Sequence, residues 1–388
     1  MSEKRIHDGF VENVRIRYRL GAWDRDKQFS ICFLQSYPRL VREMPPKSQN
    51  MKALLYPEFD TLQLCEQSVP EPAADEVLLR VSACGICGSE LESFQTRSPR
   101  RPPPLVMGHE FCGVIERLGE AVEGWAPGDR VVSNSVVPCD NCPLCSRGDT
   151  HLCEKRQIFG MHRFGAFAEW TNVPARCLLP WPDDLPAEAA CLAEPLGNGV
   201  HIVRLTQHLP AKRVLVIGAG PIGLMCQQAL QVLRGSQVLV SDLVDERLQA
   251  ASAVGAELVI NAGREDLAGV IQDWTDGQGM DLVVDAVGSE ITKKQSIAAC
   301  RPGGAAVWIG LHGNSLTFDS YDLTLPEKQV LGTYSAKMEE LAKALELLAD
   351  GKIEVAQWVQ SFPLDEGVDA FLRMVAAKGN DIKAVLMP

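Results

Sequence analysis

The sequence lacks several features that would place it in a specialised class of protein. It has no run of 18 or more apolar residues, and its first 20 residues lack the apolar core of a signal peptide. Its 13 cysteines in 388 residues are an odd number, far below the density of a secreted disulfide scaffold. We therefore expect a cytoplasmic protein with reduced cysteines and no membrane partner.

An excess of basic charge is also missing. The chain has 38 Lys and Arg against 50 Asp and Glu, a formal net charge of −12. This balance argues against binding to nucleic acid or anionic membranes and favours a small-molecule substrate. The charge is uneven, because residues 1–50 hold 10 basic and 6 acidic residues and the remaining 338 carry a net charge of −16.

The length predicts more than one domain, because single cores stop growing at roughly 250–300 residues. Residues 1–50 show no sustained helical or strand period and end in the breaker-rich MPPKSQN. We interpret them as an N-terminal extension that is weakly ordered or a translated upstream stretch. An interaction arm is the alternative.

The rest of the chain shows two kinds of hydrophobic pattern, followed by a shorter C-terminal segment. Residues 51–199 give short apolar runs between turn residues, such as EVLLRVSACG and CGVIERLG, which predicts an all-β barrel or sandwich. Residues 200–331 alternate strands with helices, as in RVLVIGAG, PIGLMCQQALQVLRG and QVLVSD, which predicts a doubly wound α/β unit. Residues 332–388 give a helix, a short strand, a second helix and the final strand KAVLM.

A glycine motif lies between a predicted strand and a predicted helix. In G-x-G-x-x-G, Gly218 makes the tight turn, Gly220 lets the backbone approach a pyrophosphate, and Gly223 allows close helix packing. Asp242 ends the next strand, where a carboxylate can bind both ribose hydroxyls, and no Arg or Lys follows it at 243 or 244. We therefore expect NAD rather than NADP. The other expected cofactor contacts are Pro221, Ile222, Val287 and Arg247, the last being equally well explained as a solvated helix charge.

Four cysteines occur within fifteen residues in the pattern C-x2-C-x2-C-x7-C. They are Cys139, Cys142, Cys145 and Cys153. Four thiolates can close a tetrahedral shell around a structural zinc ion and leave no open position. Two disulfides and an iron–sulfur cluster are the alternatives. His151 lies inside this loop but is not needed as a ligand.

A second set of candidate ligands is dispersed along the chain. Cys87 lies in CGICGSE, His109 and Glu110 in MGHEF, and Glu194 in CLAEPLGN. In order and spacing, these motifs with the four-cysteine loop and GAGPIG resemble the zinc-dependent medium-chain alcohol and polyol dehydrogenases. The sorbitol dehydrogenase-like and threonine dehydrogenase-like branch is the most similar, and the resemblance covers Met51 to Pro388.

The resemblance implies a mixed α/β fold, with a Rossmann nucleotide-binding domain and a GroES-like β-barrel catalytic domain. It implies a catalytic zinc ion held by Cys87, His109 and Glu194, the last directly or through water, with Glu110 orienting the site or approaching the metal. Ser89 would relay the proton of the alcohol, although the histidine that often ends this relay is replaced by Glu92. A homodimer or homotetramer is also implied.

The expected reaction is hydride transfer from a secondary alcohol of a polyol or sugar derivative to NAD, which gives a ketone. The alternatives are oxidation of a hydroxy amino acid by an L-threonine 3-dehydrogenase-type enzyme and, more distantly, a non-catalytic nucleotide-binding relic of the fold. The substrate is open, but Arg97, Arg100 and Arg101 lie in one loop and could hold a phosphate or carboxylate. A solvated loop is the favoured interpretation of these arginines.

Overall fold

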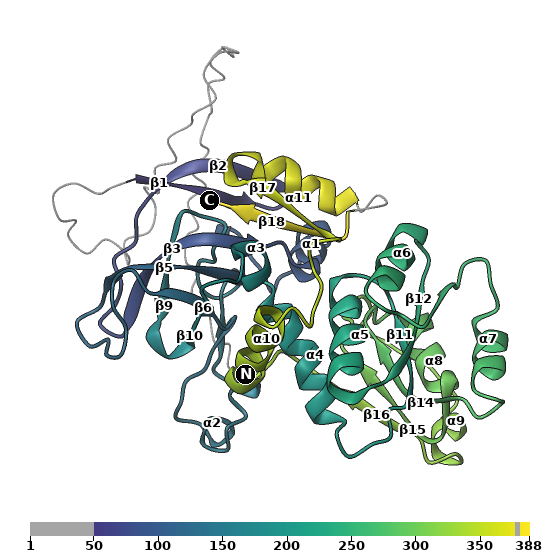
Figure 1. Cartoon of the computed structure of the whole chain (residues 1–388). Coiled ribbons are helices and arrows are strands. Elements are labelled where there is room, and N and C mark those ends of the chain that lie inside the picture. Colours follow the sequence, from purple (N-terminus) through teal and green to yellow (C-terminus); the bar gives the residue numbers. More distant parts are fainter. Residues whose placement is uncertain (1–49, 377–380) are drawn as a thin grey trace, which may run out of the picture.

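The computed structural model describes residues 50–376 and 381–388, so the predicted extension, apart from Asn50, lies outside the described residues. A β-rich lobe and an α/β lobe lie side by side, with helices between them (Figure 1). Within these ranges no helix has the length and apolar character that a membrane span requires.

The α/β lobe is built on one parallel sheet of six strands in the order β13-β12-β11-β14-β15-β16. The strands are β11 (Arg213–Ile217), β12 (Gln237–Asp242), β13 (Leu258–Asn261), β14 (Met280–Asp285), β15 (Cys300–Trp308) and β16 (Gln329–Gly332). The helices are α5 (Pro221–Arg234), α6 (Asp245–Ala253), α7 (Leu267–Trp274), α8 (Glu290–Ala299) and α9 (Tyr321–Thr324). The strand order reverses beside β11, so the prediction of a doubly wound sheet is confirmed.

The β-rich lobe holds a seven-stranded sheet, a three-stranded sheet and the pair β7-β8. Its strands are β1 (Asn50–Glu58), β2 (Thr61–Ser68), β3 (Glu76–Gly85), β4 (Leu105–Val106), β5 (Glu110–Leu118), β6 (Arg130–Ser133), β7 (Val136–Val137), β8 (Gln157–Ile158), β9 (Trp170–Pro174), β10 (Leu178–Pro180), β17 (Val359–Pro363) and β18 (Lys383–Met387). The C-terminal β18 pairs with β3, so the end of the chain returns to the first lobe.

Short helices complete the β-rich lobe. They are α1 (Gly88–Gln95), α2 (Pro143–Ser146), α3 (Ala187–Ala190), α11 (Gly367–Ala376) and the 3-10 turns η1 (Thr150–Leu152), η2 (Ala175–Cys177) and η3 (Leu364–Glu366). The prediction of an all-β pattern over residues 51–199 is therefore wrong at α1, α2, α3 and the start of α4 (Ala193–Leu205). The proposed boundary between residues 199 and 200 falls inside α4.

Helix α4 was not predicted from hydrophobic periodicity because it is buried on almost every side. Its residues from Ala193 to Val203 are all buried, so apolar and polar positions do not alternate. Two glycines take the place of larger side chains on this helix. A Cβ at Gly199 would lie 3.0 Å from the carbonyl oxygen of Met225, so the glycine lets α4 approach α5 closely.

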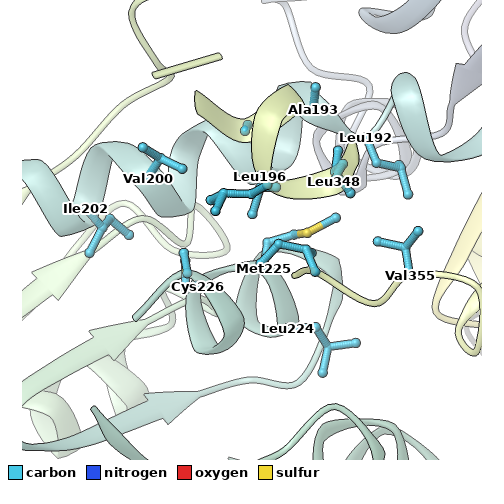
Figure 2. Packing of buried hydrophobic residues seen from close by; sticks show 14 of the residues in the cluster. Leu192, Ala193, Leu196, Val200, Ile202, Leu224, Met225, Cys226, Leu348 and Val355 are labelled. Atoms are coloured by element: carbon cyan, nitrogen blue, oxygen red, sulfur yellow. The ribbon is translucent and has the colours of Figure 1, made fainter. Parts of the chain in front are cut away.

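The packing between the lobes is a continuous apolar core. Leu196 of α4 and Met225 of α5 belong to one cluster with Leu348 of α10 (Met338–Ala349), as Figure 2 shows. Val355, which follows α10, closes the same cluster. This core therefore holds α4, whose first turn carries Glu194, against α5 of the α/β lobe.

Candidate active site

Three potential metal ligands meet where α1, β5 and the loop before β5 converge. The donor atoms of Cys87, His109 and Glu110 all lie within 4.8 Å of one another. Cys87 is the N-cap of α1, and Glu110 is the first residue of β5. A thiolate, an imidazole and a carboxylate form a donor set that suits zinc.

Glu90, one turn into α1, holds these ligands in place. Its Oε2 accepts a hydrogen bond from the backbone N of Cys87 at 3.0 Å, and its Oε1 lies 2.8 Å from Nδ1 of His109. Burial alone would raise the pKa of Glu90, but His109 and the more distant Arg101 charge outweigh it and hold this pKa at about 2. An ionised Glu90 fixes Nδ1–H of His109 and leaves Nε2 for a metal.

The charges around His109 favour a cation at this position. Burial alone would lower the pKa of His109, but the charges of Glu90 and Cys87 raise it well above its ordinary value. A metal ion bound through Nε2 would supply the positive charge in place of that proton.

Glu110 is paired with a lysine from the far end of the sequence. Its Oε2 forms a buried ion pair with Lys383 of β18, whose Nζ also donates to the carbonyl oxygen of Ile86 at 2.9 Å. Burial alone would lower the pKa of Lys383, but Glu110 raises it above its ordinary value. A Cβ at Gly85 would lie 2.2 Å from Glu110 Oε2, so a larger residue there would displace this carboxylate.

Glu194 lines the same cavity as Cys87 and His109 but lies outside the group of three. It is buried on α4, and its Oε1 accepts a hydrogen bond of 2.6 Å from the hydroxyl of Ser135. Burial raises the pKa of Glu194, and the charge of Glu110 raises it further while that of His109 lowers it. The structure thus places Glu194 on the wall of this cavity and Glu110 within the group of three donors.

Ser89 lies directly beside the cluster. Its hydroxyl is 3.4 Å from Sγ of Cys87 and accepts a hydrogen bond of 3.1 Å from Nη2 of Arg101. Glu92, one turn outward on the same helix, also lines the cavity and forms a loose ion pair with Arg100 at 3.6 Å. Ser89 therefore lines the cavity directly beside Cys87.

The cavity extends to the glycine motif of the α/β lobe. Its volume is about 890 Å³, and Gly220, Pro221, Ile222, Gly223 and Val287 line it together with the metal-type ligands. Gly218 has φ +97°, and a Cβ at Gly223 would lie 1.8 Å from its carbonyl oxygen. A Cβ at Gly220 would meet no atom within 4 Å, so this backbone is open to a phosphate at the start of α5.

Asp242 closes the turn beside the glycine motif. Its Oδ2 accepts a hydrogen bond from the backbone N of Ala219 at 2.7 Å, and its Oδ1 accepts from Leu243 at 2.7 Å and Val244 at 2.9 Å. Arg247 lies on α6 outside the cavity lining, and its buried Nε has no hydrogen-bond partner within residues 50–376 and 381–388. Buried Thr333 Oγ1, on the cavity wall, also has no partner in the described part of the chain and is therefore available to a polar group of a cofactor.

The four predicted loop cysteines come together in space. The sulfurs of Cys139, Cys142, Cys145 and Cys153 lie within 4.8 Å of one another. The sulfurs of Cys142 and Cys145 are 3.5 Å apart, too far for a disulfide, and none of the four loop cysteines forms a disulfide. The alternative of two disulfides is therefore wrong. Lys337, just before α10, binds Asp149 of the loop at 2.9 Å.

Comparison with known families covers both lobes. Residues 73–183 match the family described as alcohol dehydrogenase GroES-like domain, and residues 221–350 match the zinc-binding dehydrogenases. An L-threonine 3-dehydrogenase of Pyrococcus horikoshii is 37% identical over 68% of this chain and 76% of its own length. The chain belongs to the zinc-binding medium-chain dehydrogenases.

Other relatives of this dehydrogenase are named for polyol and sugar substrates. A D-arabitol-phosphate dehydrogenase of Enterococcus avium is 31% identical over 85% of this chain and 95% of its own. An L-galactonate-5-dehydrogenase of Escherichia coli K12 is 30% identical over 87% and 98% of the two chains.

Solved structures of similar proteins contain nicotinamide cofactors. A protein of Sinorhizobium meliloti 1021, described as a zinc-binding dehydrogenase and bound to NADP, superposes with a TM-score of 0.81 at 30% identity over 88% of this chain and 100% of its own. An alcohol dehydrogenase of Escherichia coli CFT073 with NADH gives a TM-score of 0.82 at 28% identity over 87% and 99%. The chain is therefore a zinc-dependent NAD(P) dehydrogenase that oxidises alcohols.

The structure corrects the expectation that three arginines share one exposed loop. Arg97 pairs with Asp60 on the surface, and Arg100 lines the cavity. Arg101, however, is only 2% exposed and donates to the carbonyl oxygens of Ser89 and Gly160. The favoured interpretation as a solvated loop fits Arg97 and is wrong for Arg101, which is part of the packing behind Ser89.

Three residues of the dehydrogenase's site were not predicted from the sequence. Glu90 could have been found, because an acidic residue three positions after a helix N-cap is the pattern of a capping box. Lys383 could have been flagged as the one charge in the terminal strand KAVLM. Ser135 gave no signal, because nothing local connects it to Glu194.

Proposed function

We propose that the enzyme oxidises a secondary alcohol of a polyol or sugar derivative to a ketone, with NAD as the hydride acceptor. The observation that carries this proposal is that one cavity of about 890 Å³ is lined by both the Cys87, His109 and Glu110 group and the Gly220 turn. An alcohol at the metal-type ligands would then lie beside the cofactor. The polyol names of two relatives support the substrate class.

We assign the catalytic zinc to Cys87 and His109 with Glu194 and Glu110, and a structural zinc to the four loop cysteines. The donor sets fit, because the first combines S, N and O donors beside a cavity and the second is four thiols in a loop. When bound, zinc would supply a Lewis acid that lowers the pKa of the alcohol, and NAD would supply the hydride acceptor. Direct binding by Glu194 would require its carboxylate to share or release Ser135.

Ser89 is our candidate for the first proton carrier. Its oxygen accepts a hydrogen bond from Arg101 and keeps a second lone pair. That lone pair would accept the hydroxyl proton of the alcohol, while Ser89 releases its own proton outward. Glu92 is the nearest carboxylate on the outer side of α1 that lines the cavity, and we propose it as the acceptor.

NAD is preferred over NADP in this proposal because Asp242 places a carboxylate where a 2′-phosphate would lie. Replacing Asp242 by Ser together with Leu243 by Arg should shift the ratio of kcat/KM values toward NADP. Since Asp242 also accepts three backbone hydrogen bonds, a thermal melt of the variant must accompany the kinetics. Asp245→Asn, on the next helix, is a control that should leave the cofactor ratio unchanged.

A threonine-type 3-dehydrogenase is the second candidate, favoured by the identity of 37% to the Pyrococcus horikoshii enzyme. A screen of NAD reduction over polyols, sugars, their phosphates and 3-hydroxy amino acids separates the two. Faster turnover of a polyol derivative supports the first candidate. Turnover restricted to L-threonine and related amino acids would replace it with the second.

We further propose a homodimer or homotetramer joined through the nucleotide sheet. The edge strand β16 follows a segment that exposes Phe318, Tyr321 and Leu325 at 39%, 67% and 76%. Light scattering after gel filtration tests this assembly. We retain residues 51–199 and 332–388 as the catalytic domain, 200–331 as the nucleotide domain, and a cytoplasmic location, which agrees with the need for reduced thiolates at both metal sites.

A further inference from the structure

Arg156 stands in the wall of the cavity with part of its guanidinium unused. Its Nη1 donates to the carbonyl oxygen of Cys153 at 3.0 Å, and its guanidinium lies 4.9 Å from the ring centroid of Tyr334. Its Nε is buried and has no hydrogen-bond partner among the described residues. None of the carboxylates in the described part of the chain forms an ion pair with it, although the protein is acidic overall.

Other positively polarised groups lie around Arg156. Arg101 is buried, and all its hydrogen bonds go to uncharged oxygens. His162 accepts a hydrogen bond at Nδ1 from the backbone N of Ile158 at 3.1 Å, so its neutral ring carries the proton on Nε2 as a donor. Burial, Arg156 and Arg101 all lower the pKa of His162, and no carboxylate opposes them.

The acidic side chains that share this wall do not neutralise it. Glu92 is already paired with Arg100 at 3.6 Å. Glu154 lines the cavity but is exposed and forms no ion pair within the described ranges. A buried N–H without an acceptor is costly, and a planar guanidinium binds carboxylate or phosphate through two parallel hydrogen bonds. The donor left for an anionic ligand oxygen is Nη2, which forms no hydrogen bond within the described residues and, unlike Nε, is not buried.

We propose that Arg156 binds an anionic group, a carboxylate or a phosphate, on the alcohol substrate, with His162 as a second donor. This inference rests on the proposed function and narrows its substrate to acidic or phosphorylated polyols. The proposed anion site differs from the one suggested by the sequence, which was the loop that carries Arg97, Arg100 and Arg101. Arg156 lies outside that loop, and Arg101 adds only its positive charge from its buried position behind Ser89.

The test compares glucitol, gluconate and glucitol 6-phosphate with the zinc-loaded enzyme and NAD. The wild type should use at least one of the two anions better than glucitol. Arg156→Gln should lower kcat/KM for that anion by roughly 10- to 100-fold, mainly through KM, with little change for glucitol. Arg156→Lys keeps the positive charge but loses the planar guanidinium. Its kcat/KM for the anion should lie between the values of the wild type and of Arg156→Gln. A preference for gluconate identifies a carboxylate, and one for the ester identifies a phosphate.

Lys155→Gln is the matched control, because it removes the same charge from the adjacent exposed residue that does not line the cavity. It should behave as the wild type. The zinc content of every variant must stay equal, since Arg156 contacts the backbone of Cys153. Equal losses for glucitol and the anions in Arg156→Gln would overturn the proposal. If Arg156→Gln raised only the KM for NAD, the proposal would also be overturned. That result would show that the guanidinium binds a phosphate of the cofactor.

Failure of the proposed function gives a different result, namely no NAD reduction with any alcohol. Calorimetric titration of the same three compounds into the zinc-loaded protein then tests the subsite alone. Binding of an anion that weakens roughly 10-fold or more in Arg156→Gln supports it without any turnover. Equal binding by wild type and variant, or no binding of either anion, contradicts it.

Discussion

The four-cysteine loop and the cavity cluster hold similar metal donors but differ in how the chain assembles them. The loop draws Cys139, Cys142, Cys145 and Cys153 from one short segment. The cavity cluster draws Cys87, His109 and Glu110 from two segments and adds a lysine from the last strand. The first can form wherever its loop folds, whereas the second requires the whole β-rich lobe.

The surroundings of the two clusters differ in the same way. The loop cysteines are partly exposed apart from Cys153, and the loop meets the rest of the protein through contacts such as Asp149 with Lys337. The cavity cluster is supported by buried charges, with Glu90 behind His109 and Lys383 behind Glu110. Supporting charges of this kind orient ligands for chemistry, so we expect damage to the cavity cluster to affect turnover and damage to the loop to affect stability.

The largest effect on turnover is expected for Cys87→Ser. Loss of this ligand should reduce kcat by about 10³-fold or more, because it removes the Lewis acid that the reaction needs. The melting temperature should change little. Cys84→Ala, a buried thiol three residues earlier that is not in the cluster, is the control and should keep most of its activity. Turnover by Cys87→Ser within about tenfold of the wild type would contradict this assignment.

A smaller effect is expected for Glu90→Gln, which keeps the shape but loses the charge behind His109. Turnover should fall by about 10- to 100-fold, in the range measured for residues that support metal ligands. Steady-state kinetics at saturating zinc measure it. If Glu90→Gln matched the wild type, the hydrogen bond to His109 would have no catalytic role.

The pH dependence of stability sharpens the same test. The pKa of Glu90 is held at about 2 from an ordinary 4.5, so its ionised form stabilises the fold above pH 4.5. This contribution is lost as the pH falls through the range from 4.5 to about 2. The difference in melting temperature between wild type and Glu90→Gln should therefore be largest near neutral pH and shrink below pH 4.5. A difference that grows in acid would contradict the assigned charge.

The smallest effect on turnover is expected for Cys142→Ser in the loop. Its melting temperature should fall by about 5 °C or more through loss of a structural metal, while kcat at 25 °C changes only a few-fold. Ser146→Ala is the control, an exposed non-ligand of the same loop. If Cys142→Ser lost as much turnover at 25 °C as Cys87→Ser, the loop would also be needed for catalysis. The proposed separation of a catalytic cluster from a structural one would then be contradicted.

Local patterns in the sequence predicted the parts of the site that are local in the fold. The four-cysteine spacing and the turn at Gly218 and Gly220 depend on a few consecutive residues, so their geometry follows from the sequence. The cavity ligands could be grouped only through the family resemblance. Lys383 was missed because its pairing with Glu110 depends on β18 lying next to β3, a contact across most of the chain.

Helix α4 and Arg101 were misjudged for a related reason. A helix buried on every side shows no amphipathic period, so periodicity did not predict α4. Arg101 lies in a run rich in proline and arginine that suggests solvent, yet its guanidinium is buried against Ser89. In both cases the partner that decides the environment is remote in sequence.

The zinc content of four proteins tests the central claim most directly. Mass spectrometry of the metal in the wild type, Cys87→Ser, Cys142→Ser and the double variant should give two, one, one and no zinc ions per chain. The claim predicts that activity follows the ion lost with Cys87. It would be contradicted by a wild type that holds a single zinc lost with Cys142, or by a Cys87→Ser variant that keeps two.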